Sequence, residues 1–144
     1  MRPWTFLDYW PSERSNPVRE WTTRMGHQNP RIPIELDAAI DALRQTPDWR
    51  NPPIPRLYRD LEDDLAGLGE IVFEFEEEQR GERPKRRRFR AFVQLREEQH
   101  DCVLLVCCEH WPRHRLYEPA DAPALARKYA DALAGDVGYT DRHF

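Results

Sequence analysis

Two short stretches of the sequence gather residue types that can act on a phosphodiester. The first, HWPRHRLY, places two histidines, two arginines and a tyrosine within residues 110–117, directly after a strongly apolar run. Acid–base work on RNA needs these types, because a base takes the 2′-hydroxyl proton, a cation stabilises the charge on phosphorus and an acid protonates the leaving oxygen. The alternative is a surface loop with scattered polar groups. The candidate catalytic residues are His110, Arg113, His114, Arg115 and Tyr117.

The second stretch, RGERPKRRRFR, begins at residue 80 and carries seven basic residues in eleven positions. It follows the acidic phrase EIVFEFEEE, so one interpretation is a hairpin whose opposite charges stabilise each other by about 0.2–1 kcal/mol per pair. That explains some of the arginines but does not require seven, whereas a polyanionic partner would favour the whole cluster. The residues predicted to bind RNA backbone phosphate are Arg83, Lys85, Arg86, Arg87 and Arg88.

Arg90 is the most specific candidate in this second stretch. It alternates with apolar residues along a predicted strand, so the sheet would hold its guanidinium in place. Arginine is also suited to binding phosphate through two parallel hydrogen bonds. We therefore include Arg90 among the catalytic candidates.

Metal-dependent chemistry is the weaker reading of the sequence. Cys107, His110 and His114 have ligand-like spacing, but Cys107 and Cys108 are adjacent on a strand and point to opposite faces. No second pair of ligands follows elsewhere. The acidic residues between 60 and 64 are bunched in one loop, which favours a solvated loop over a two-metal nuclease site. We predict no metal and no cofactor.

Length and composition bound the class of protein. The chain has 144 residues, 40 % of them hydrophobic and 33 % charged, which suits one globular domain. The formal net charge of −4 argues mildly against nonspecific coating of DNA. No run of about 18 apolar residues is present, so no membrane span is expected. Three cysteines, an odd number, argue against a disulfide framework and favour the reducing cytoplasm.

The first half of the chain reads as a short strand followed by two helices. Aromatic residues before Pro11 suggest the strand. Asn16 is a good N-cap, Pro17 fits the first helical position and Gly26 fits the end, which predicts a helix. A second helix is expected over about residues 33–45. The two helices would form a hairpin.

The second half reads as three strands and a helix. Residues 70–78 and 88–96 alternate apolar with polar side chains, and residues 101–111 form a continuous apolar run typical of a central strand. A helix over about residues 121–134 would precede a loose tail. The expected fold is α+β: a single domain over residues 1–134, with a small, mostly antiparallel sheet of about four strands and helices on one face, followed by a C-terminal tail at 135–144.

Four phrases, in this order, resemble those of a known family: NPVREW, LAGLGEIVFEF, RRFRAFVQL and VLLVCCEHWPRHRLYEPADAPALARKYADAL. The chain resembles the RelE/ParE superfamily of type II toxin–antitoxin toxins, and within it the HigB-like, phage-derived branch. The resemblance covers about residues 4–134. It implies a small sheet packed on a helical hairpin, with a C-terminal helix.

The resemblance also implies a function and site residues. The family's strand arginine falls on Arg90 and its late tyrosine on Tyr117. Its basic and histidine positions at the end of the last strand fall on His110, Arg113, His114 or Arg115. The chain departs from the family pattern where Val72 and Phe73 replace the usual arginine after the second-strand glutamate, and in its acidic net charge.

The leading function that this resemblance implies is ribosome-dependent cleavage of mRNA by a toxin, which its cognate antitoxin inhibits. The mechanism would be metal-independent attack by the 2′-hydroxyl, leaving a 2′,3′-cyclic phosphate. Two alternatives stay open. One is a non-catalytic binding module, such as a gyrase inhibitor, and the other is a degenerate member that retains only antitoxin or nucleic-acid binding.

Overall fold

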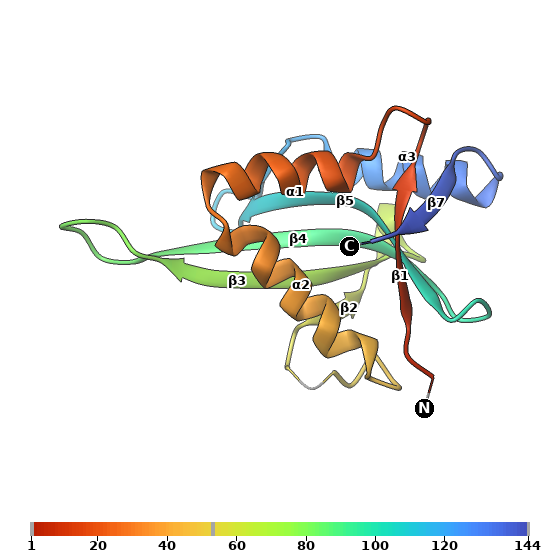
Figure 1. Ribbon diagram of the computed structural model, residues 1–144, viewed down its shortest axis with the longest axis horizontal. Helices are drawn as coiled ribbons and strands as arrows, with labels where there is room; N and C mark the ends of the chain where they lie inside the picture. The colour runs from red at the N-terminus through yellow and green to blue at the C-terminus, as the bar shows by residue number, and fades with distance from the viewer. Residues whose placement is uncertain (1, 53, 144) are drawn as a thin grey trace.

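The computed structural model describes residues 2–52 and 54–143, which form a mixed β-sheet with helices on both faces (Figure 1). In chain order the elements are β1 (Thr5–Trp10), α1 (Pro17–Gln28), α2 (Arg31–Arg44), β2 (Tyr58–Asp60), the 3₁₀ turn η1 (Asp63–Leu65), β3 (Gly69–Glu77), β4 (Lys85–Arg96), β5 (Asp101–Trp111), β6 (Leu116–Glu118), α3 (Ala122–Ala134) and β7 (Tyr139–Arg142).

The described residues form a sheet of seven strands in the order β2-β3-β4-β5-β1-β7, with β6 paired to the C-terminal end of β5. β1 runs parallel to β5, and the other pairs are antiparallel. The register places Arg90 of β4 between Val72 of β3 and Cys108 of β5. His110 pairs with Tyr117 across the β5–β6 hairpin. Residues far apart in the sequence are thus neighbours on one sheet.

Strand alternation divides the buried side chains between two cores. Phe73, Phe89 and Cys107 belong to the core beneath α1 and α2, which cover one face of the sheet. Phe92 and Cys108 belong to the core on the opposite face, against which α3 packs. Figure 1 shows α1 and α2 in front of the sheet and α3 behind it.

α1 begins as its sequence predicts. Asn16 Oδ1 accepts a hydrogen bond from the backbone N–H of Arg19 at 3.0 Å, and Pro17 occupies the first turn. Val18, Trp21 and Met25 are buried on the face toward the sheet. The predicted cap and apolar stripe of this helix are therefore confirmed, and the helix runs on past Gly26 to Gln28.

The predicted sheet of about four strands is wrong, and so is the prediction of helices on one face. β2 and β6 have three residues each, which is too short for a readable alternation. α3 packs on the second face through the buried small residues Ala122, Ala126 and Ala130, and its larger residues Leu125, Tyr129 and Leu133 are partly buried against the same core. The tail prediction also fails at residues 139–142, because these form β7 on the edge of the sheet beside β1.

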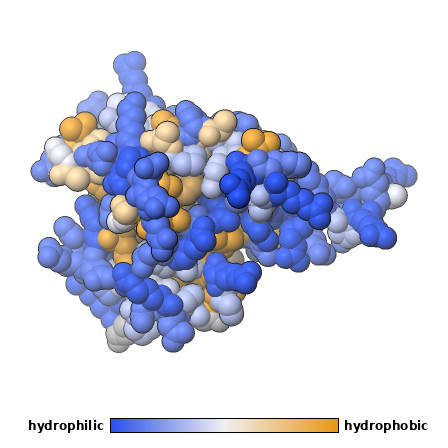
Figure 2. Space-filling model, turned by 180° about the vertical axis from the view of Figure 1, so that it is seen from behind, coloured by the Kyte–Doolittle hydropathy of each residue, from blue (hydrophilic) through white to orange (hydrophobic). Residues whose placement is uncertain are grey.

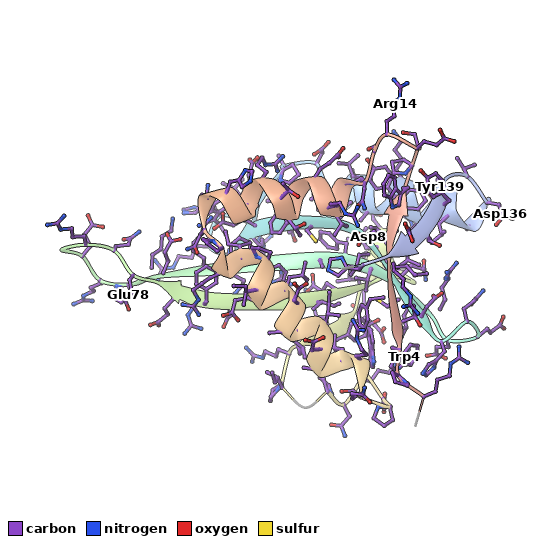
Figure 3. All side chains as sticks on the ribbon, viewed as in Figure 1. Trp4, Asp8, Arg14, Glu78, Asp136 and Tyr139 are labelled. Atoms are coloured by element: carbon purple, nitrogen blue, oxygen red, sulfur yellow. The ribbon has the colours of Figure 1, made fainter. Side chains whose placement is uncertain are left out.

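The β3–β4 hairpin extends beyond the rest of the molecule, and its loop spans residues 78–84 (Figure 1). Glu78 lies where this loop leaves the sheet (Figure 3). We call the segment of residues 77–85 the projecting hairpin. Over the residues described, no helix combines the length and the apolar character that crossing a membrane would need.

Candidate nucleic-acid interface

Beyond the part of the sheet on which α3 packs, the same face becomes polar. Alternation along β3, β4 and β5 brings charged side chains to this face, because their neighbours in sequence point to the α1–α2 core. We call this surface the open face. Its side chains are Arg59, Glu70, Glu74, Glu76, Arg86, Arg88, Arg90, His110 and Tyr117.

A buried carboxylate organises the centre of the open face. The side chain of Glu70 is 1 % exposed and accepts hydrogen bonds from two guanidinium groups, those of Arg90 and Arg59. The Arg59 Nε–Oε1 distance is 2.6 Å. A carboxylate removed from water is stable only when paired in this way. Glu70 therefore fixes the position of Arg90, whose side chain is 11 % exposed.

Arg90 is also bonded to His110, which sets the protonation state of the imidazole. Arg90 Nε donates to His110 Nδ1 at 2.8 Å, so Nδ1 is an acceptor and the neutral ring carries its hydrogen on Nε2. Burial, followed by the nearby Arg90 charge, lowers the pKa of His110 to about 4. His110 is thus neutral near pH 7.

Tyr117 packs against this imidazole. The two rings are stacked, with centroids 4.5 Å apart and an angle of 13° between their planes. Phe92 also lies near the tyrosine, with ring centroids 6.0 Å apart. Burial raises the pKa of Tyr117, although the Arg90 charge opposes the shift, so the phenol keeps its proton at neutral pH. The structure therefore brings together three of the predicted residues, namely Arg90, His110 and Tyr117.

Arg86 and Arg88 lie on the open face but are paired across the β3–β4 ladder. Arg86 Nη1 donates to Glu74 Oε1 and Arg88 Nε donates to Glu74 Oε2, each at 2.8 Å. Glu76 adds a longer contact to Arg86 at 3.6 Å. This is the hairpin stabilised by opposite charges that the sequence left open as an alternative. The pairing involves two of the predicted phosphate-binding residues, Arg86 and Arg88.

Arg87 does not lie on the open face, so its predicted role in binding phosphate does not fit the structure. It faces the α1–α2 side and is buried. Its guanidinium bonds Glu109 through Nε at 3.0 Å and Nη2 at 2.7 Å, and it bonds Glu77 at 3.1 Å. These hydrogen bonds, of which that to Glu109 has the largest effect, raise the pKa of Arg87. Arg87 is a buried structural cation.

The remaining predicted residues are exposed at the same end of the sheet as the projecting hairpin. Arg113, His114 and Arg115 form the turn between β5 and β6, and Arg83 and Lys85 lie in the projecting hairpin. Among the residues described, these five side chains make no ion pair within 4 Å. Figure 2, which views the molecule from the side opposite to Figure 1, shows this projecting end as hydrophilic. They lie outside the cluster of Arg90, His110 and Tyr117 but beside it along the sheet.

Cys107 and His110, two of the three residues with ligand-like spacing, point to opposite faces of the sheet. Cys107 and Cys108 belong to cores on opposite faces of the sheet, as the sequence predicts. Burial raises the pKa of Cys108 to about 12. Within residues 2–52 and 54–143, no group of three or more His, Cys, Asp or Glu side chains is arranged to hold a metal ion.

Glu70 and Arg59, at the centre of the open face, were not predicted as site residues from the sequence. Glu70 could have been predicted, because it shares the alternation that places Val72 and Glu74 on one face of β3. Arg59 lies on the three-residue strand β2, which is too short for an alternation that would predict its position.

Comparisons of the chain with family models, with curated proteins and with solved structures found no match. The case for a function therefore depends on the residues of the open face and on the resemblance of the four sequence phrases.

Proposed function

We propose that the chain is the toxin of a type II toxin–antitoxin pair, which binds RNA on the open face and cleaves mRNA at the ribosome. The observation that carries the proposal is the position of Arg90, which Glu70 holds next to His110 and Tyr117. Its partners would be the cognate antitoxin, mRNA and the ribosome. A cytoplasmic location follows from this substrate and suits the three free, buried cysteines.

The charge at the centre of the open face favours an anion. Two guanidinium groups, those of Arg59 and Arg90, share the single carboxylate of Glu70, which leaves one positive charge in excess. Arg59 is 66 % exposed, so part of this charge is available to a ligand. The hydrogen on His110 Nε2 and the hydroxyl of Tyr117 are further donors. This set suits the non-bridging oxygens of a phosphodiester.

The roles in cleavage follow from the contacts of each group. Arg90 would stabilise the charge that develops on phosphorus. His110 becomes a base when the phosphate draws Arg90 Nε away from Nδ1, because this frees the acceptor and removes a charge that lowers the His110 pKa. Tyr117 would donate a hydrogen bond to a non-bridging oxygen. His114, on the neighbouring turn, is the candidate for protonating the leaving 5′ oxygen.

Inducing the chain alone in cells and mapping transcript 5′ ends tests this proposal. We expect growth arrest with new 5′ ends inside translated regions, and neither effect in cells expressing Arg90→Lys at an equal level. Growth arrest without new 5′ ends would exclude cleavage as the cause.

A second candidate function is binding without catalysis, as in a gyrase inhibitor. The pairing of Arg86 and Arg88 with Glu74 favours it, because matched charges suit a protein partner as well as RNA. The low pKa of His110 favours it too, because burial and then the Arg90 charge lower this pKa to about 4 and make the imidazole a weak base. Inhibition of gyrase supercoiling by the purified chain, with transcripts left intact, would support this candidate over cleavage.

A further inference from the structure

Arg86 and Arg88 hold the carboxylate of Glu74 between them. They are successive open-face residues of β4, and each donates to a different oxygen of the same carboxylate at 2.8 Å. The side chains are 57 %, 34 % and 34 % exposed for Arg86, Arg88 and Glu74, so solvent reaches the whole group. Each arginine donates a hydrogen bond to one oxygen of the carboxylate. Two oxygens of a phosphate can accept the same two hydrogen bonds.

This pair of arginines lies next to the centre of the open face. Arg88 and Arg90 are two residues apart on β4, or roughly 7 Å along the strand. The antiparallel register pairs Phe89 of β4 with Glu109 of β5, so Arg88 and His110, one residue further on, are neighbours across the two strands. A phosphate held by Arg86 and Arg88 would therefore be a neighbour of one held at Arg90.

We propose that Arg86 and Arg88 form a binding site for one RNA backbone phosphate and that Glu74 occupies this site in the free protein as an internal substitute for it. The inference rests on the proposed binding of RNA to the open face. Exposed ion pairs contribute little stability, so a phosphate can displace the carboxylate. The displaced Glu74 stays close and repels the ligand. Glu74 thus weakens RNA binding without preventing it.

Glu76 supplies a matched control. It lies two residues from Glu74 on the same face of β3, its side chain is 61 % exposed, and among the described residues this side chain forms an ion pair with Arg86 alone, at 3.6 Å. Glu74→Gln and Glu76→Gln change the net charge of the protein by the same amount. A general gain in positive charge would therefore affect RNA binding equally in both variants, whereas release of the two-arginine site requires Glu74→Gln.

The experiment measures binding of a fluorescently labelled 12-nucleotide oligouridylate by anisotropy, between about 50 and 200 mM salt. Wild type and Glu74→Gln would make the same phosphate contacts, and the variant lacks only the repulsion by the displaced carboxylate, which salt screens. We expect Glu74→Gln to bind more tightly than wild type at low salt, with a gain that shrinks as the salt concentration rises. Glu76→Gln should remain close to wild type. In the background of Arg86→Gln with Arg88→Gln, Glu74→Gln should have no effect on affinity.

The outcomes separate this inference from the proposed function. Equal effects of Glu74→Gln and Glu76→Gln would overturn the inference while leaving RNA binding by wild type intact. A gain from Glu74→Gln that persists without Arg86 and Arg88 would also overturn it. If neither wild type nor Glu74→Gln binds the oligonucleotide at the lowest salt, both the inference and RNA binding by the open face fail. Thermal melting of each variant within a few degrees of wild type verifies that the protein is folded.

Discussion

Arg90 Nε and His110 Nδ1 form a hydrogen bond of 2.8 Å between neighbouring strands β4 and β5. The bond needs a lone pair on Nδ1, so it exists only while that nitrogen is unprotonated. Protonation of His110 and its bond to Arg90 therefore exclude each other. The imidazole becomes an available base only when Arg90 moves, which links the protonation of His110 to whatever Arg90 binds.

The first prediction concerns the titration of His110. We expect its ring protons to titrate near pH 4 in wild type, because burial and then Arg90 lower the pKa. Arg90→Gln should raise the pKa toward the ordinary value of about 6.5, since it removes the nearby charge and leaves Glu70 to favour the imidazolium. Two-dimensional NMR of the histidine side chains as a function of pH measures the shift. Arg86→Gln is the control and should leave it unchanged.

This titration also has a consequence for stability. A histidine whose folded pKa lies below its unfolded pKa binds fewer protons when folded, so the free energy of unfolding falls as pH drops from about 6.5 toward 4. A wild-type His110 that titrates near 6.5 would contradict the proposed contact with Arg90.

The second prediction separates Arg87 from its neighbours. Arg87→Gln should lower the free energy of unfolding by about 3–5 kcal/mol, because it leaves the buried Glu109 without its charge partner. Arg88→Gln removes a half-exposed pair and should cost at most about 1 kcal/mol. Urea unfolding measures both. An Arg87→Gln protein of wild-type stability that fails to bind RNA would show that Arg87 contacts the ligand after all.

The third prediction concerns His143, which ties the end of β7 to the body of the protein. Its Nδ1 lies 2.8 Å from Asp8 Oδ1 and its Nε2 lies 3.1 Å from Asp37 Oδ1, and Asp8 also accepts from Asn16. Asp8 lies where β1 and β7 run side by side (Figure 3). Burial opposes the charged imidazole, but the hydrogen bonds to Asp37 and Asp8 outweigh burial and raise the pKa of His143 to about 9.

The sign of the effect on stability follows from this raised pKa. The stabilisation by His143 is fully present below about pH 6.5 and is lost as pH rises through about 9. Its size is on the order of 3 kcal/mol. We expect the free energy of unfolding to fall over this range in wild type and to vary much less in His143→Gln. His114→Gln, at an exposed histidine, is the control and should behave as wild type. Equal pH dependence in wild type and His143→Gln would contradict the account.

The fourth prediction concerns metals. Chelation with EDTA should leave both the melting temperature and RNA cleavage unchanged, because the proposed chemistry uses side chains alone. Metal analysis of the purified protein is the companion measurement. One equivalent of zinc, lost together with structure on chelation, would show that Cys107, His110 or His114 binds a metal.

The sequence predicts the elements whose residues repeat with a clear period. The cap at Asn16 and the buried Trp21 mark α1, and the apolar run through Val106 marks the central strand β5. β2, β6 and β7 have three or four residues each and are held by backbone pairing to their neighbours, which leaves no periodic signature in the side chains. The sheet therefore has more strands than the sequence reveals.

The candidate site was predictable only in part. Arg90 could be recognised because it alternates with Phe89 and Ala91. The same alternation, carried back one step, places Arg87 with Phe89 on the buried face, but the strand was predicted to begin at residue 88, three residues after its start at Lys85. The pairing of Glu70 with Arg59 and Arg90 depends on the register of three strands, and no local pattern in the sequence encodes that register.

The most direct test of the central claim is a single-turnover cleavage assay. It uses mRNA bound to purified ribosomes with excess protein and EDTA present, and it identifies the 3′ ends of the products. We expect wild type to cleave and to leave 2′,3′-cyclic phosphate ends. Arg90→Lys keeps a charge beside Glu70 but loses the Nε–H bonded to His110, so it should fold and cleave roughly a hundredfold more slowly. Absence of cleavage by wild type, or undiminished cleavage by a folded Arg90→Lys, would contradict the account.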